Sequence, residues 1–78
     1  AREIIMKNLK EKNININLHQ TNFGLICKKY NLKDNEDYFY YHTLTKRYVC
    51  SQKLVDFVTN LLIENINLIE EIKLENKN

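Results

Sequence analysis

Apolar residues recur at intervals of three and four in two stretches near the N-terminus, which is the spacing of one face of an α-helix. In residues 2–12 this face carries Ile5 and Leu9, with Met6 beside them. In residues 22–31 it carries Phe23, Ile26, Cys27 and Tyr30. The pattern therefore predicts two short helices in the first part of the chain.

Polar residues mark the ends of these helices. The first is expected to stop at Lys12-Asn13, and Thr21 or Asn22 can cap the start of the second, because a short polar side chain satisfies a free backbone N–H there. Between the helices, residues 13–18 alternate Asn with Ile or Leu. This period of two is typical of a half-buried strand or an extended linker. Since Asn is a poor strand former, we expect a linker that can add one edge strand.

Residues 38–50 place aromatic and β-branched residues on both sides of a short polar segment. This arrangement is typical of a β-hairpin, although the turn lacks the Asn-Gly pair that favours the tightest hairpins. In a strand, Tyr38 and Tyr40 would face one way and Phe39 and Tyr41 the other. A third short helix is the alternative, because no Gly or Pro interrupts the stretch. We favour the hairpin.

The C-terminal part carries a wide apolar surface. Ser51 is suited to cap a helix that runs from about 52 to 74. Its apolar residues form two stripes, Val55-Val58-Leu62-Ile66-Ile69-Ile72 and Leu54-Leu61-Leu68. Each exposed Leu or Ile forgoes roughly 1.5–3 kcal/mol of burial, so we expect the second stripe to be covered, by Ile5 and Leu9 or by another chain. A break between 60 and 67 that folds the chain back is the alternative.

Length and composition indicate one small domain. The chain has 78 residues, and its 44% of hydrophobic residues is typical of a globular protein rather than a disordered one. The predicted fold class is α+β and mainly helical, with two short N-terminal helices, a small hairpin near 38–50 and a long C-terminal helix; an all-α bundle is the alternative. Apolar runs are too short for a transmembrane helix. The absence of Met at position 1 fits a fragment of a longer chain or a processed terminus.

Residues that could carry metal or nucleophilic chemistry do not follow a known spacing. His19, Cys27, His42 and Cys50 are the only His and Cys residues, and they form neither Cys-x-x-Cys nor His-x-x-x-His. A single glycine cannot build a phosphate-binding loop. The two cysteines are expected to be reduced thiols of an intracellular protein. We therefore predict no catalysis, no metal and no cofactor.

The charge of the chain gives only a modest indication of nucleic-acid binding. The net charge is +2, and dedicated phosphate binders usually carry more. The candidate contacts are Lys28 and Lys29 on the second helix and Lys46 and Arg47 at the hairpin tip. A basic hairpin beside a helix is similar to the wing of a winged-helix domain, but only a short polar segment stands where that fold has its third helix. Asn-rich stretches receive little weight, because AT-rich codons alone produce an Asn excess.

Residues 25–58 resemble the SWIB domain. The matching pieces are Ile26-Cys27-Lys28-Lys29, Asn31-Leu32-Lys33-Asp34 and Tyr48-Val49-Cys50-Ser51-Gln52-Lys53-Leu54-Val55. They follow the family's order of a helix with a basic end, a polar turn, a hairpin and a Leu-rich helix. The resemblance implies a hydrophobic cleft for an amphipathic helix, lined here by Leu25, Ile26 and Tyr30. It also implies a nuclear role in transcription assemblies.

Together these features favour a non-enzymatic protein-protein interaction domain. The candidate partner-binding residues are Leu25, Ile26, Tyr30, Leu54, Leu61 and Leu68. The expected partner is another protein, a helical peptide or a second copy bound through the C-terminal helix. A small winged-helix-like nucleic-acid-binding domain is the alternative function, and a steep dependence of affinity on salt would distinguish it.

Overall fold

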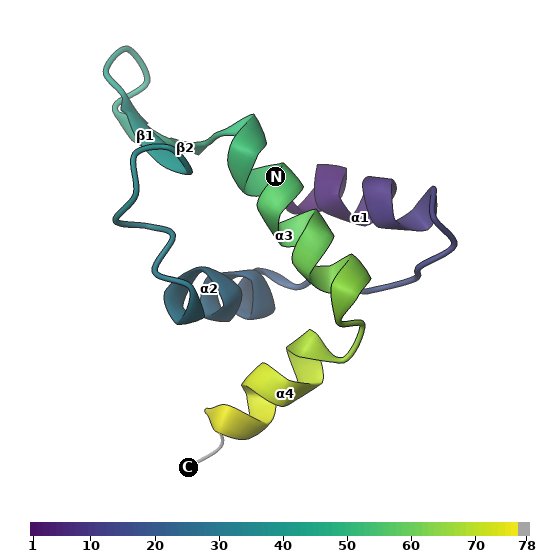
Figure 1. The fold of residues 1–78 in the computed structure, drawn as a ribbon. Coiled ribbons are helices and arrows are strands. Elements are labelled where there is room, and N and C mark those ends of the chain that lie inside the picture. The colour runs from purple at the N-terminus through teal and green to yellow at the C-terminus, as the bar shows by residue number, and fades with distance from the viewer. Residues whose placement is uncertain (77–78) are drawn as a thin grey trace.

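The computed structural model describes residues 1–76, which fold into four helices and a two-stranded hairpin (Figure 1). In chain order the elements are α1 (Arg2–Lys10), α2 (Gln20–Lys29), β1 (Phe39–His42), β2 (Arg47–Cys50), α3 (Gln52–Glu64) and α4 (Leu68–Glu75). The predicted class, α+β and mainly helical, is confirmed, and so is the hairpin near 38–50. No helix in this part of the chain is long and apolar enough to cross a membrane.

Helix α1 ends close to the predicted stop, through a left-handed residue. Asn13 has a φ of 62°. The backbone N–H groups of Asn13 and Ile14 donate to the carbonyl oxygens of Lys10 and Leu9, each at 2.9 Å. This pair of bonds is the Schellman motif, which satisfies carbonyl groups that the helix itself leaves free. The motif explains why the regular helix ends before Lys12.

The alternating segment that follows is a linker rather than a strand. Residues 14–19 form no ladder, and the sheet consists of β1 and β2 within residues 1–76. Leu18 is fully buried, and Ile14 and Ile16 are half-buried. The period of two therefore arises because one side of an extended chain lies against the core.

Helix α2 begins at Gln20 instead of residue 22. His19 is the N-cap residue, with an extended backbone and no side-chain capping bond. Thr21 and Asn22 lie inside the first turn, so the capping role predicted for them is wrong. The side chain of Asn22 is buried instead. The first turn is closed by the Phe23 N–H, which donates to the His19 carbonyl at 2.9 Å, so the helix forms without a side-chain cap.

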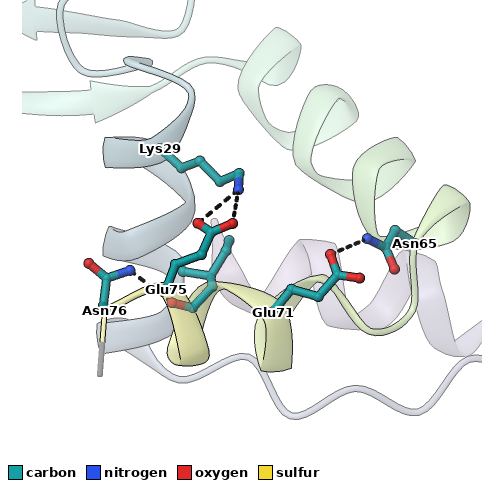
Figure 2. Close-up of polar contacts among 6 residues, drawn as sticks. Lys29, Asn65, Glu71, Glu75 and Asn76 are labelled. Atoms are coloured by element: carbon teal, nitrogen blue, oxygen red, sulfur yellow. Dashed lines mark hydrogen bonds and ion pairs between the residues drawn. The ribbon is translucent and has the colours of Figure 1, made fainter. Parts of the chain in front are cut away.

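The C-terminal apolar stretch breaks into two helices at Asn65. This residue has an extended backbone, with φ −139° and ψ 92°. Its side chain accepts from the Asn67 N–H at 3.1 Å. It also donates to the Glu71 carboxylate at 2.8 Å, the bond that Figure 2 shows. A continuous helix over 52–74 is therefore wrong, and the alternative with a break is confirmed. Ile66 lies at the break and is 59% exposed, so it leaves the predicted stripe.

The core lies where the helices meet, with α1 packed on α3 and α4 packed on α2. The buried hydrophobic residues are Ile5, Leu9, Leu18, Ile26, Cys27, Leu32, Leu54, Val55, Val58, Leu62, Leu68, Ile69 and Ile72. Of the second stripe, Leu54 and Leu68 are buried and Leu61 is half-buried. The chain's own helices thus cover this stripe without a second copy.

Candidate nucleic-acid interface

The hairpin stands out from the helices at one end of the molecule (Figure 1). Its register pairs His42 with Arg47, so residues 43–46 form the turn. Lys46 closes this turn with a φ of 52°. The Nδ1 atom of His42 accepts a hydrogen bond from the Thr45 N–H at 3.3 Å. This bond holds the turn against the end of β1.

An exposed leucine lies in the turn. Leu44 is 89% exposed, the largest fraction among the large hydrophobic residues of 1–76. Its neighbours Thr43 and Thr45 are exposed as well. The outermost part of the hairpin therefore presents one large apolar side chain between two small hydroxyl-bearing ones.

Two tyrosines face each other across the strands behind the turn. Tyr41 lies directly opposite Tyr48, with ring centroids 5.4 Å apart and an edge-to-face angle of 75°. Both rings are exposed, as is Tyr40 on the other face of β1. Tyr38 precedes the strand and packs on Phe57 at 5.3 Å, so it does not share a strand face with Tyr40. The free aromatic surface of the hairpin is thus centred on the Tyr41–Tyr48 pair.

The two strands and their turn contain no carboxylate, whereas Asp34 and Glu36 line a hollow beside Tyr40 and Tyr41 at the base of the hairpin. Between Asp37 and Asp56 the sequence has no Asp or Glu, but it has Lys46, Arg47 and Lys53. Lys53 pairs with Asp37 at 3.6 Å. Neither Lys46 nor Arg47 forms an ion pair with any of residues 1–76. The hairpin tip therefore carries two positive charges that nothing in the described chain neutralises.

A cavity of about 470 Å³ lies between the hairpin, α1 and the start of α3. The side chains with polar atoms that line it come from His42, Thr45, Arg47, Tyr48, Ser51 and Gln52. None of its lining residues is acidic, and His42 and Arg47 are direct cross-strand partners. The cavity therefore has one cationic side chain, Arg47, and no carboxylate among its lining residues.

The two candidate lysines of α2 belong to a different surface. The Nζ atom of Lys29 donates to both carboxylate oxygens of Glu75, at 2.7 and 2.9 Å (Figure 2). This hydrogen bonding raises the pKa of Lys29 above its ordinary value. Lys28 is exposed beside it. Because α2 lies well apart from the hairpin turn (Figure 1), the four candidate cations form two groups, and α4 partly neutralises the one on α2.

The six candidate partner-binding residues do not form one surface. They are Leu25, Ile26, Tyr30, Leu54, Leu61 and Leu68. Ile26, Leu54 and Leu68 are at most 3% exposed, because they hold the helices of the chain together. The other three are half-buried or exposed. A partner could reach only these three without opening the core.

The two cysteines are free thiols. Burial raises the pKa of Cys27 to about 11, and the nearby Cys50 contributes to the rise. Burial also raises the pKa of Cys50. Thiols become nucleophilic when their pKa is lowered, so neither cysteine is tuned for attack. Within residues 1–76, no three His, Cys, Asp or Glu side chains gather where they could hold a metal ion.

A known domain family accounts for nearly the whole chain. The family model described as the EC042_2821-like restriction endonuclease-like domain matches residues 1–73. The chain belongs to this family. No curated protein and no solved structure matches this chain.

Membership of the restriction endonuclease-like family corrects several predictions. The SWIB resemblance over residues 25–58 is wrong, because the family match runs over 1–73 and is to a different domain. The interpretation as a non-enzymatic interaction domain in transcription is wrong as well. The expected nuclear location rested on the SWIB resemblance and has no other support. The exclusion of catalysis is also overturned, because the family is endonuclease-like. The residues that resemble SWIB reflect only the order of a helix, a hairpin and a second helix, and unrelated domains share this order.

Sequence reasoning identified part of the restriction endonuclease-like domain's exposed tip. It placed Lys46 and Arg47 at the end of the hairpin, where the structure has them. It did not single out Leu44, because periodicity detects apolar residues that face a core and gives no weight to one in a turn. The available signal was a leucine between two threonines in an otherwise polar turn.

Proposed function

We propose that this chain binds duplex DNA through the β1–β2 hairpin, as the substrate-holding domain of a nuclease. The observation that carries the proposal is the match of residues 1–73 to a restriction endonuclease-like family. Restriction endonucleases hydrolyse phosphodiester bonds in duplex DNA, so a domain of this kind has to hold a polyanion.

The charges of the hairpin support phosphate binding. Lys46 and Arg47 are exposed and unpaired within residues 1–76. Each cation that meets a phosphate releases a condensed counterion, which supplies most of the affinity of non-specific DNA binding. Two-stranded ribbons and sheets are also known to contact DNA from either the major or the minor groove.

The cavity lined by His42 and Arg47 supports a fixed phosphate contact behind the tip. Arg47 can engage a phosphate through two parallel N–H donors. Because Nδ1 of His42 accepts from Thr45, the neutral ring carries its proton on Nε2, which is then able to donate. The two residues lie opposite each other, so one phosphate can contact both.

Hydrolysis in nucleases commonly relies on bound metal ions. The acidic residues nearest the hairpin in sequence are Asp34, Glu36 and Asp37, and all three are exposed. They do not form a metal-binding group with other residues of 1–76. We therefore assign substrate binding to the hairpin and derive no hydrolytic step from these residues.

Fluorescence anisotropy with a labelled duplex, repeated over a range of salt concentrations, tests the proposal. The double variant Lys46→Ala, Arg47→Ala should bind more weakly, and its slope of log affinity against log salt should fall by about 2. Lys7→Ala, Lys10→Ala is the matched control, because both lysines are exposed on α1, away from the tip. Equal binding by the two double variants, or no binding by the wild type at low salt, would contradict the proposal. A plasmid-nicking assay with Mg²⁺ tests directly whether the chain also cleaves DNA.

A further inference from the structure

We infer that Leu44 acts as a wedge that enters the DNA between two neighbouring base pairs from the minor groove. The inference rests on the proposed function, since it requires the hairpin to meet duplex DNA. It adds a mode of recognition, because a wedge selects sites by how readily the duplex deforms.

The position of Leu44 is the first argument. A single exposed leucine is ordinary on a protein surface. This one lies in the turn of a projecting hairpin, 89% exposed, and the bond from Thr45 to His42 braces the turn behind it. Its side chain has no hydrogen-bonding group, so it cannot read the donor and acceptor pattern of base edges. It can make an apolar contact or insert between stacked bases.

The surrounding charges are the second argument. Lys46 and Arg47 follow Leu44 within three positions, and the turn and both strands contain no carboxylate; Asp34 and Glu36 lie beside the strands behind the turn. An apolar tip with cations directly behind it is the arrangement by which minor-groove binders unstack a base step and hold the bent duplex. The occupant that fits both features is therefore a duplex, not an apolar protein groove, which would leave the cations unpaired.

Insertion has a consequence for the choice of substrate. Unstacking costs least at flexible pyrimidine–purine steps such as TA. The chain should therefore prefer duplexes with a central TA step, or with a mismatch, over stiff A-tracts of the same length. This preference requires no hydrogen bond to any base.

The test uses duplexes that carry 2-aminopurine beside a central TA step, with a donor and an acceptor dye at the two ends. Unstacking raises the 2-aminopurine fluorescence, and bending raises energy transfer. The wild type should raise both signals. Leu44→Ala should lose both and bind severalfold more weakly, with an unchanged salt slope because the phosphate contacts remain. Leu44→Met, which keeps a long apolar side chain, should restore both signals.

Leu74→Ala is the matched control, because Leu74 is a leucine 71% exposed on α4, a helix that lies away from the hairpin (Figure 1). It should behave as the wild type does. Leu44 is not packed in the core, so Leu44→Ala should fold, and its circular dichroism melting curve checks this.

Three results separate the possible failures. If the wild type binds the duplex but raises neither signal, the wedge is wrong and the proposed function stands. If uracil in place of thymine weakens the wild type as much as Leu44→Ala does, Leu44 contacts a thymine methyl group in the major groove, and the wedge is again wrong. If the wild type binds no duplex even at low salt, the proposed function itself fails.

Discussion

The backbone N–H of Leu32 donates to the carbonyl oxygen of Cys27 at 2.9 Å, and this bond closes the C-terminal end of α2. Between them, Asn31 adopts a φ of 53°, and its N–H donates to the carbonyl of Lys28. The same pair of bonds ends α1 around Asn13. Asn enters the left-handed region more readily than other residues with a side chain. Asn13 and Asn31 therefore have a structural role, although codon bias alone could account for the excess of asparagine in the sequence.

Replacing Asn31 tests this role. Asn31→Ala should lower the free energy of unfolding by about 1 kcal/mol, because alanine has no local hydrogen bond to offset the left-handed backbone. Asn31→Gly should be at least as stable as the wild type, because glycine adopts this conformation without a steric cost. Urea unfolding followed by circular dichroism measures both. The control is Asn17→Ala in the extended linker, which should change little; equal losses at positions 17 and 31 would contradict the interpretation.

Ser51 joins the hairpin to α3, which gives a second prediction. Its Oγ atom accepts from the Leu54 N–H at 3.2 Å and donates to the carbonyl of Asp37 at 2.5 Å. Ser51→Ala should therefore destabilise the fold by about 1 kcal/mol. Ser51→Asp keeps the cap but loses the donor, so it should recover only part of that loss.

Thermal unfolding of these variants beside Thr21→Ala makes the comparison. Thr21 is exposed in the first turn of α2, where it caps nothing. A Ser51→Asp variant as stable as the wild type would mean that the bond to Asp37 contributes nothing measurable.

The raised pKa of Cys27 predicts that the fold loses stability at alkaline pH. Its pKa is raised from 9.0 to about 11 in the folded chain. Between these values the unfolded chain has lost the thiol proton and the folded chain still holds it. The free energy of unfolding should therefore fall as the pH rises through this range, by up to about 2–3 kcal/mol, and the ionisation of this thiol should not affect stability below pH 9.

Urea unfolding near pH 8 and near pH 11, with a reductant present, measures the effect. Cys27→Ala is the comparison, since it loses some packing at every pH but lacks the titrating group. Its stability should decline less steeply than that of the wild type. Parallel declines would assign the alkaline loss to other groups, such as the tyrosines.

Much of the local structure follows from the sequence. The spacing of Ile5 and Leu9 and of Phe23 and Ile26 predicted the two N-terminal helices, and Ser51 was correctly expected to cap the next one. These features depend on hydrogen bonds and side-chain periods that span only a few residues. For the same reason the local order of elements was a poor guide to the family, which the match over 1–73 decided.

Other features were decided by contacts between distant elements. The sequence allowed both a continuous C-terminal helix and a break near Asn65; the break prevails because it lets Leu68, Ile69 and Ile72 be buried as α4 packs on α2. The sequence does not distinguish Lys29 from Lys46, but in the fold Lys29 is bound by Glu75, which is 46 positions away in the chain. Periodicity and composition determine which side chains a helix or strand can place on one face. Whether that surface stays open depends on what the folded chain places against it, and only the tertiary structure contains that information.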